Sequence, residues 1–482
     1  MIEIMPLLDK KDRSPLYAQL YNYIKERIES GSIPQGSKLP PIRQLSLYLK
    51  ISKNTVEAAY QQLFAEGYIE SERRIGLRVL PLEEVGLKSP SNRSVSPKKH
   101  DEESFRYDFR YGDVDTIRFP MNIWKKCLSD SLSRDPQQIF GYGHPQGSPE
   151  LREELADYLF QSRGVTCHAD QIYICAGTQH AVSAAVRLLG LRGQNVAMED
   201  PGYNGVRTVF RNEGCTLLPV SVGHDGLNAD ELVSMPDVRA VYVTPSHQFP
   251  LGMVLSVQKR MRLLQWAARH EAFIIEDDYD SEFRYLGQPI PSLKALDSKE
   301  RVIYLGTLSK SFLPAARLSY MVLPVTMKAE LEEMFSVYSN PVSPIIQQAV
   351  FLFMSRGHFS RHIRKMRRLY QAKHKTLMNA IQQYMGDRVT IIGHKSGLHI
   401  LLDVKQGGGG QLIDQAAQSG VKVYTPHIYW MDQGQCPSSY VMLGFGGLSE
   451  EEIEDGVRML SEVWFDNAAQ SGISTSEDVS DG

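Results

Sequence analysis

The chain has 482 residues, of which 42% are hydrophobic and 23% are charged, with a formal net charge of -3. Its length exceeds one ordinary domain of about 150 residues and predicts two or three units. The composition is typical of a globular protein with a large core and excludes a disordered chain. Apolar stretches near 18 residues, which a membrane span needs, are missing from the sequence, so we expect no membrane partner.

Charge and cysteine usage limit the choice of compartment and ligand. Residues 1–80 hold twelve Lys and Arg against nine Asp and Glu, a mild basic excess that supports DNA contact only alongside a motif. The five cysteines are scattered without a CxxC pair, which favours reduced thiols over disulfides or a zinc site. The opening MIEIMPLLDKKDR places apolar residues before charges, the reverse of a signal peptide. We therefore expect a cytoplasmic protein without a bound metal.

Residues 1–80 predict a small helical domain with a two-stranded wing. Leu16, Leu20, Ile24 and Ile28 recur every four residues and predict one apolar helix face over 15–30. A second helix is expected from Ile42 to about Leu49 and a third from about Lys53 to Ala65, with Ser52 as its N-cap. The segment 68–79 can form the wing, with Arg73 and Arg74 near its tip.

Two short helices joined by a tight turn, the second opening on polar residues, are typical of a helix-turn-helix. Taken singly, each basic residue here is more simply explained as solvated surface charge. The whole string, including GSKLP at 36–40, RQL at 43–45 and SKNTV at 52–56, resembles the GntR-type winged helix. The family usually has Arg where Lys53 stands, and a Gly-x-Gly wing where this chain has RIG at 74–76. The resemblance implies operator DNA as a partner, with contacts from Arg43, Ser52, Lys53, Asn54, Thr55, Arg73 and Arg74.

The rest of the chain predicts a linker, a large body and a tail. Residues 81–106 are rich in Ser, Pro, Lys and Glu and indicate a flexible linker, and residues 466–482 indicate a polar tail. Between them, in 107–465, apolar strand-like runs alternate with helical patterns, which predicts an α/β fold with a mostly parallel sheet. The expected strands are Gln171–Cys175, Asn195–Met198, Ala240–Thr244, Phe273–Glu276 and Val302–Leu305.

Polar residues with cofactor chemistry follow these strands. Lys310 lies in GTLSK, between hydroxyl neighbours and ahead of Arg317, and such a lysine suits a Schiff base beside a phosphate. On its own, Lys310 could equally be a lysine on a surface turn. Asp277 ends an apolar strand, where a carboxylate can hold a pyridine nitrogen protonated. AGTQ at 176–179 opens a helix whose free N–H groups suit a phosphate, and Tyr203 can stack on a ring. The carboxyl ends of such strands are where open α/β sheets bind ligands.

Together these segments resemble a fold-type I aminotransferase over about Tyr107 to Phe465, with a smaller C-terminal subdomain. The resemblance implies pyridoxal 5'-phosphate as cofactor and Lys310 as the Schiff-base lysine. It implies that His247 occupies the region where these enzymes keep an Asn near the ring oxygen. It also implies that Tyr142 reaches the cofactor of a neighbouring subunit, and so a homodimer. The full set of implied cofactor residues is Tyr142, Gly177, Thr178, Gln179, Tyr203, His247, Asp277, Tyr279, Thr307, Ser309, Lys310 and Arg317.

A winged helix, a linker and an aminotransferase body in this order resemble the MocR/GabR family of transcription regulators. The resemblance implies a regulator that senses a small amino compound or pyridoxal phosphate itself. The alternative is an active aminotransferase with an accessory winged helix. The stretch 441–448, where aminotransferases commonly carry a carboxylate-binding Arg, has none, and Arg118, Arg207 and His427 are the possible substitutes. We therefore expect little or no transaminase turnover, without deciding whether the chain is an enzyme.

Overall fold

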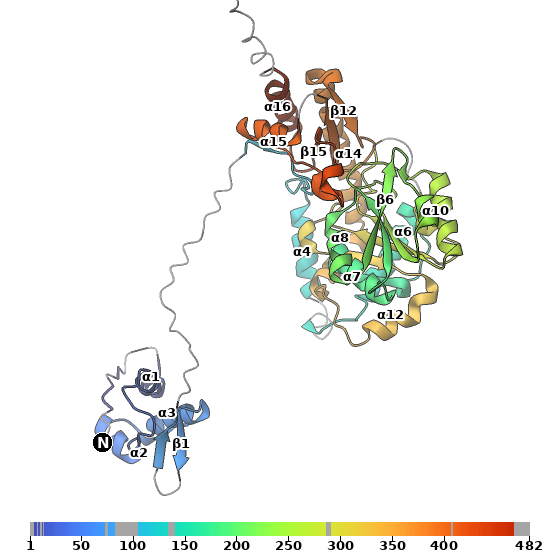
Figure 1. Ribbon diagram of the computed structural model, residues 1–482. Helices are drawn as coiled ribbons and strands as arrows, with labels where there is room; N and C mark the ends of the chain where they lie inside the picture. Colours follow the sequence, from blue (N-terminus) through green and yellow to red (C-terminus); the bar gives the residue numbers. More distant parts are fainter. Residues whose placement is uncertain are drawn as a thin grey trace, which may run out of the picture. The chain divides into compact units, whose positions relative to one another are not determined.

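The computed structural model describes residues 4–6, 8, 9, 12, 14–72, 76–81, 105–133, 140–285, 291–405 and 408–466. The chain divides into two compact units, Met1–Glu102 and Glu103–Gly482, and the division falls within the segment expected to be a linker (Figure 1). Arg73 and Arg74, most of that linker and the expected tail beyond 466 lie outside the described residues.

The N-terminal unit is a three-helix domain with a β-hairpin. Its elements are α1 (Leu16–Glu29), α2 (Ile42–Leu49), α3 (Lys53–Ala65), β1 (Ile69–Glu72) and β2 (Gly76–Val79). The two strands pair antiparallel. All three helices and the wing match the sequence prediction.

Local chemistry explains where these helices begin and end. The Ser52 hydroxyl accepts a hydrogen bond from the Thr55 N–H at 3.1 Å, which is the predicted N-cap of α3. Lys50 ends α2 in the left-handed conformation, at φ 52°, and turns the chain into α3. Leu20, Ile24 and Val56 are fully buried, so the apolar faces of α1 and α3 form the core.

The second unit is organised around a mixed sheet. In the described residues eight strands lie in the order β4-β11-β10-β9-β8-β5-β6-β7. Neighbours from β10 to β6 are parallel, whereas β11 is antiparallel to both β4 and β10. The predicted α/β fold with a mostly parallel sheet is therefore confirmed. The strands are β4 (Ile172–Cys175), β5 (Asn195–Asp200), β6 (Thr216–Gly223), β7 (Gly226–Leu227), β8 (Val238–Val243), β9 (Phe273–Asp278), β10 (Val302–Thr307) and β11 (Ser319–Val322).

Helices cover both faces of this sheet (Figure 1). Alternating residues explain why: Tyr173 and Cys175 pack on one face with residues of α7, α8 and α12, whereas Ile172 and Ile174 pack on the other with α4, α6 and α13. The short α9 and α11 and the longer α10 complete the second face. The helices are α4 (Met121–Leu132), α6 (Pro149–Arg163), α7 (Thr178–Leu188), α8 (Asn204–Asn212), α9 (Glu231–Ser234), α10 (Val257–Arg269), α11 (Leu293–Leu296), α12 (Lys328–Phe335) and α13 (Pro344–Ser355).

The C-terminal part forms the expected smaller subdomain. Strands β12 (Val389–Ile392), β13 (His399–Val404) and β15 (Tyr440–Gly444) make an antiparallel sheet. Strand β14 (Val421–Lys422) returns to pair with β3 (Tyr107–Asp108) from the start of the unit. Apolar residues of the long α14 and of α16 enclose the core of this subdomain. Its helices are α14 (His358–Tyr384), α15 (Gly409–Gln418) and α16 (Glu450–Ser461).

Short helical turns connect these elements. They are η1 (Ala169–Gln171), η2 (Pro314–Ala316), η3 (Val325–Met327), η4 (Gly386–Arg388), η5 (His427–Tyr429), η6 (Gln433–Gln435) and η7 (Glu462–Asp466). Among the described helices none is both long and apolar enough to cross a membrane.

Candidate functional site

A cavity of about 230 Å³ opens at the carboxyl edge of the large sheet. Strands β5, β8, β9 and β10 are parallel and end at this edge. Strand β4 ends there too, because β11 runs antiparallel between β4 and β10. Loops after five strands thus converge on one point, as the sequence predicted. The cavity is lined by Tyr111, Gly112, Thr178, Gln179, Tyr203, Tyr242, Thr244, Phe249, Asp277, Tyr279, Thr307, Ser309, Lys310, Pro314 and Arg317.

Asp277, near the end of β9, is the buried acid of this cavity. The Tyr242 hydroxyl on the neighbouring β8 donates to Oδ2, whereas Oδ1 is buried and has no hydrogen-bond partner among the described residues. Burial raises the pKa of Asp277 to about 7, against the lowering effect of the Tyr242 hydrogen bond. A buried carboxylate oxygen without a donor favours a cationic N–H group in the cavity.

Lys310 is the amine of the site, in the loop after β10. Its Nζ donates to the Gly112 carbonyl oxygen at 3.0 Å and lies 4.6 Å from the centre of the Tyr111 ring. Burial lowers the pKa of Lys310 to about 8, with Asp280 and Asp113 acting in the opposite direction. A larger fraction of this lysine is therefore neutral, and nucleophilic, at physiological pH than of an exposed one.

Anion-binding groups gather where α7 begins. Gly177 caps the helix at φ 93°, and a Cβ there would lie 2.4 Å from Arg317 Nη2, so a glycine allows the guanidinium to approach the helix N-terminus. Ser309 and Thr307 lie on the same side of the cavity, with Oγ atoms 3.0 Å apart. Free N–H groups, hydroxyls and a guanidinium form a suitable cup for a phosphate.

Aromatic rings cover the cavity. Phe249 lies at the centre of this group, with ring centroids 4.8 Å from Tyr111, 5.7 Å from Tyr203 and 6.2 Å from Tyr279. Tyr429 packs on the far side of Phe249 at 4.6 Å. These rings give a flat ligand both an apolar surface and nearby hydroxyls.

The structure brings most of the residues predicted for the cofactor to this cavity. Gly177 lies directly beside them, against Arg317. Tyr142 is 85% exposed and does not line the cavity of its own chain, so its contact with a neighbouring subunit stays a prediction. The predicted residues that line the cavity are Thr178, Gln179, Tyr203, Asp277, Tyr279, Thr307, Ser309, Lys310 and Arg317.

His247 lies behind the cavity wall. It is 2% exposed, and its Nδ1 is 2.9 Å from the hydroxyl of Tyr279, which lines the cavity. Phe249, two residues later in the same loop, lies at the wall itself. The predicted role of His247 near the ring oxygen stays a prediction.

Sequence reasoning assigned no cofactor role to six residues that line the cavity, which are Tyr111, Gly112, Tyr242, Thr244, Phe249 and Pro314. Tyr242 lies within an apolar strand, and the only signal for it was a hydroxyl near the end of a strand beside β9. Tyr111 and Gly112 follow β3, far from Lys310 in sequence, and belong to no recognised motif. Tyr111 and Gly112 reach the cavity because the main chain before them passes directly against Gly444. A Cβ at Gly444 would lie 2.4 Å from the Arg110 carbonyl oxygen, so this approach requires a glycine.

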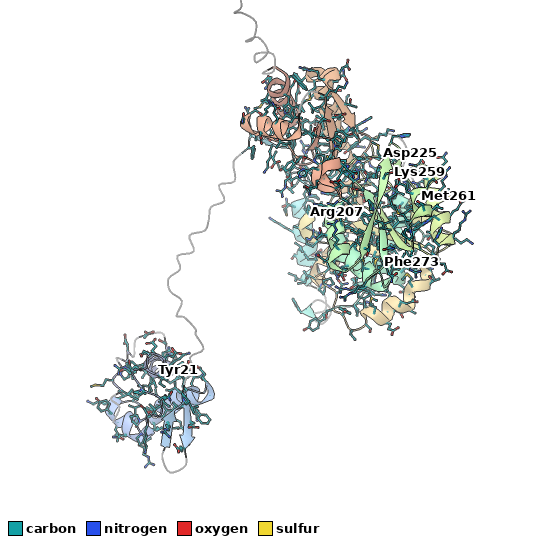
Figure 2. The ribbon with its side chains drawn as sticks, viewed as in Figure 1. Tyr21, Arg207, Asp225, Lys259, Met261 and Phe273 are labelled. Atoms are coloured by element: carbon teal, nitrogen blue, oxygen red, sulfur yellow. The ribbon has the colours of Figure 1, made fainter. Side chains whose placement is uncertain are left out.

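The possible substitutes for a carboxylate-binding arginine lie elsewhere. Arg207 on α8 (labelled in Figure 2) donates to the main-chain oxygens of Ile428 and Tyr429 and so holds their loop in place. His427 bonds to the Thr425 hydroxyl at 2.9 Å, and Arg118 is exposed. Of the described residues that line the cavity, the one arginine is Arg317.

In the N-terminal unit, the residues predicted to touch DNA lie at the start of α2 and α3. Arg43, Ser52, Lys53 and Asn54 are exposed and Thr55 is partly buried, with its hydroxyl 2.7 Å from that of Ser52. Exposed polar residues at the N-terminus of the second helix of the pair have the placement that base or phosphate contacts require.

Comparison with known families assigns both units. Residues 16–79 match the family described as bacterial regulatory proteins, gntR family. Residues 110–460 match the family described as aminotransferase class I and II.

Individual proteins match over nearly the whole chain. The HTH-type transcriptional regulator YdeL of Bacillus subtilis is 40% identical over 96% of this chain and 100% of its own length. The probable rhizopine catabolism regulatory protein MocR of Rhizobium meliloti is 31% identical over 95% of both chains. A multiple substrate aminotransferase from Thermococcus profundus shares the fold, with a TM-score of 0.69 and 23% identity, over 81% of this chain and 98% of that one.

We predict that Lys310 titrates near pH 8 in protein prepared without ligands, compared with about 10.4 for an ordinary lysine. The measurement is a pH titration, by NMR, of the ¹³C signals of reductively methylated protein. Lys310→Arg, which loses the signal, serves to assign it. A midpoint above pH 10 would contradict the description of the site.

We predict that Asp277→Asn stabilises the ligand-free protein at alkaline pH. Because the folded pKa of Asp277, about 7, lies above its ordinary value of 3.8, the wild type loses stability as pH rises through this interval, whereas Asn does not ionise. The free energy of unfolding of the variant minus that of the wild type, measured by denaturant titration, should increase from pH 5 to pH 8.5 by an amount on the order of a few kcal/mol.

Asp115→Asn provides the control of opposite sign. Burial raises the pKa of Asp115, but the hydrogen bonds from Lys373 and from the Arg118 N–H, together with the charges of both residues, outweigh burial and the net pKa is lowered. This variant should therefore be less stable than the wild type above pH 4. Equal pH profiles for the two variants would show that Asp277 is not strained by burial.

Proposed function

Because the chain belongs to the MocR-type family of GntR transcription regulators, which carry a class I and II aminotransferase domain, we propose that it is a DNA-binding regulator that uses pyridoxal 5'-phosphate. The N-terminal unit binds operator DNA. The second unit binds the cofactor and responds to a small amino compound or to the cofactor itself. The observation that carries this proposal is the joint occurrence, in one chain, of the exposed N-terminus of α3 and the Lys310–Asp277 cavity.

The residues present fit the cofactor. Asp277 Oδ1, buried without a donor among the described residues, suits a protonated pyridine nitrogen. The N-terminus of α7 with Arg317, Thr307 and Ser309 suits the phosphate, and Tyr203 offers a ring to stack on. When bound, the cofactor supplies an aldehyde carbon that exchanges one amine for another and a ring that withdraws electrons.

The chain's own residues determine how that chemistry is used. Lys310, with its lowered pKa, provides the amine that holds the aldehyde and that an effector amine displaces. Asp277 orients the ring by holding a proton on its nitrogen. Tyr279 places a hydroxyl at the cavity wall for the ring oxygen, and the aromatic cover of Tyr111, Tyr203 and Phe249 excludes water.

The sensor interpretation is favoured over the enzyme because, among the described residues, the cavity lining holds no arginine besides Arg317. Arg317 lies against Gly177 at the start of α7, where it suits the phosphate, and Arg207 is bound to main-chain oxygens. An amino acid without a bidentate arginine loses the orientation that proton transfer requires, and a misplacement of about 1 Å costs on the order of 100-fold in rate. Binding of an effector amine needs no such orientation.

A homodimer in the cytoplasm completes the proposal. Ile117, Phe140 and Tyr142 are 92%, 69% and 85% exposed, and such apolar side chains in one segment, 117–142, suit a subunit contact. Dimerisation would bring Tyr142 to the partner's cofactor and supply two winged helices for two half-sites. The cytoplasm is the compartment that holds the DNA.

We predict a separation of functions between the two units. Arg43→Ala and Lys53→Ala should abolish footprinting of the operator and leave the visible absorbance of the bound cofactor unchanged. Lys310→Ala should keep DNA binding but lose the borohydride-fixable bond to the cofactor. Affinity for DNA should fall with salt, with a log–log slope of about 0.9 per neutralised phosphate.

The matched control is Glu57→Ala on α3, which removes an exposed charge of the opposite sign from the same helix. It should retain DNA binding. If Arg43→Ala and Lys53→Ala bound DNA like the wild type, or if binding did not depend on salt, the winged helix would not be the DNA-binding unit.

We also predict that amines change operator affinity without steady-state turnover. The purified holoprotein is mixed with candidate amines and 2-oxoglutarate, and both product formation and DNA affinity are measured. Turnover at ordinary aminotransferase rates, with no effect of any amine or of the cofactor on DNA binding, would favour the alternative of an enzyme with an accessory winged helix.

A further inference from the structure

Behind the cavity wall, three side chains form a chain of short contacts. His247 Nδ1 lies 2.9 Å from the Tyr279 hydroxyl and 2.8 Å from Asp280 Oδ2. His247 and Asp280 are 2% and 3% exposed. Tyr279 lines the cavity, whereas His247 does not. Any contact of His247 with a ligand therefore passes through the Tyr279 hydroxyl, whereas the charge of Asp280 also acts directly on Lys310.

The contacts determine where the proton of His247 lies. An Asp280 carboxylate can only accept, so it favours a proton on Nδ1. The other ring nitrogen, Nε2, is buried and has no partner among the described residues, and a proton there would be an unsatisfied donor. The contacts therefore place a proton on His247 Nδ1, shared between Asp280 Oδ2 and the Tyr279 oxygen.

This arrangement orients the Tyr279 hydroxyl. Because Nδ1 already carries a proton, the Tyr279 oxygen can only accept from it, and the phenolic hydrogen must point elsewhere. The open direction is the cavity. Burial, followed by the charge of Asp280, raises the pKa of Tyr279 well above its ordinary value, so the hydroxyl keeps its hydrogen and remains a donor.

The C-terminal subdomain closes over the same pair. A Cβ at Gly397 would lie 2.0 Å from His247 Cε1 and 2.7 Å from Asp280 Oδ2, so the loop before β13 packs directly on both side chains. The Gly397 N–H donates to the Phe283 carbonyl oxygen at 2.8 Å, and the Tyr285 hydroxyl donates to the Gly397 carbonyl oxygen at 2.7 Å. The pair thus lies between the cavity wall and the subdomain.

We propose that Asp280 and His247 are positioning residues that aim the Tyr279 hydroxyl at the ring oxygen of the bound cofactor, in a contact sealed by Gly397. The inference rests on the proposed cofactor site. The titratable and charged groups that face the pair are Tyr279, Tyr285, His399 on β13 and, across the cavity, Tyr111, Asp277 and Lys310.

The test is a pH titration of the visible absorbance of the holoprotein. A hydroxyl donated to the ring oxygen stabilises its anion and lowers the apparent pKa of the bound chromophore. His247→Asn and Tyr279→Phe should each raise that apparent pKa by about one unit, the effect of one lost hydrogen bond. In the Tyr279→Phe background, His247→Asn should add nothing, because both changes remove the same contact.

His362→Asn is the control, since His362 is a 5% exposed histidine that does not line the cavity. It should leave the apparent pKa unchanged. An unchanged value in His247→Asn, or a His247→Asn shift that persists in the Tyr279→Phe background, would overturn the proposal. If His247→Asn fails to fold, His247→Gln decides. A wild-type protein with no cofactor band would instead overturn the proposed function.

Discussion

The site depends on a carboxylate that the fold buries without satisfying it. Asp277 receives one hydrogen bond, from Tyr242, and its second oxygen has no donor in the described structure. Such a group destabilises the folded chain unless a cation arrives from outside. The sheet tolerates this unsatisfied carboxylate because β8, β9 and β10 are parallel and buried on both faces. The backbone of these strands is therefore held independently of the side chains at their ends. A ligand with a cationic ring nitrogen satisfies the carboxylate, and ligand binding is thereby coupled to the stability of the site.

Much of this site could be predicted because an apolar run followed by polar residues indicates where each strand ends. The runs that end at Cys175, Asp278 and Thr307 are apolar and buried nearly throughout, as strands of a sheet covered on both faces must be, and the polar residues of the site stand at their ends or shortly after them. The three helices of the winged domain were predictable for a similar reason, since Ser52 caps α3 and Leu20, Ile24 and Ile28 share one face. In both units, local chemistry and global fold favour the same conformation, which makes the sequence informative.

What could not be predicted depends on contacts between distant segments. Tyr111 reaches Lys310 only because the chain after β3 crosses the C-terminal subdomain at Gly444, and no local pattern encodes that crossing. The placement of His247 behind the wall and of Phe249 at it is of the same kind. In the sequence, His247 and Phe249 stand two residues apart in one polar loop. The loop before β13 packs on His247 through Gly397, and this contact between distant segments cannot be seen in the sequence. The expected contact of Tyr142 lies on another subunit, so a single chain does not test it.

A regulator requires only that its effector bind two arrangements of the protein with different affinities. In this chain the groups that hold a ring nitrogen and a phosphate come from the large sheet, whereas Gly397, which seals the hydroxyl at the ring oxygen from behind, belongs to the C-terminal subdomain. Displacement of Lys310 from the aldehyde by an effector amine would change the contacts on the side of the large sheet and leave the packing of Gly397 on His247 and Asp280 in place. An unequal change of this kind is what would let an effector bind two subdomain positions with different affinities.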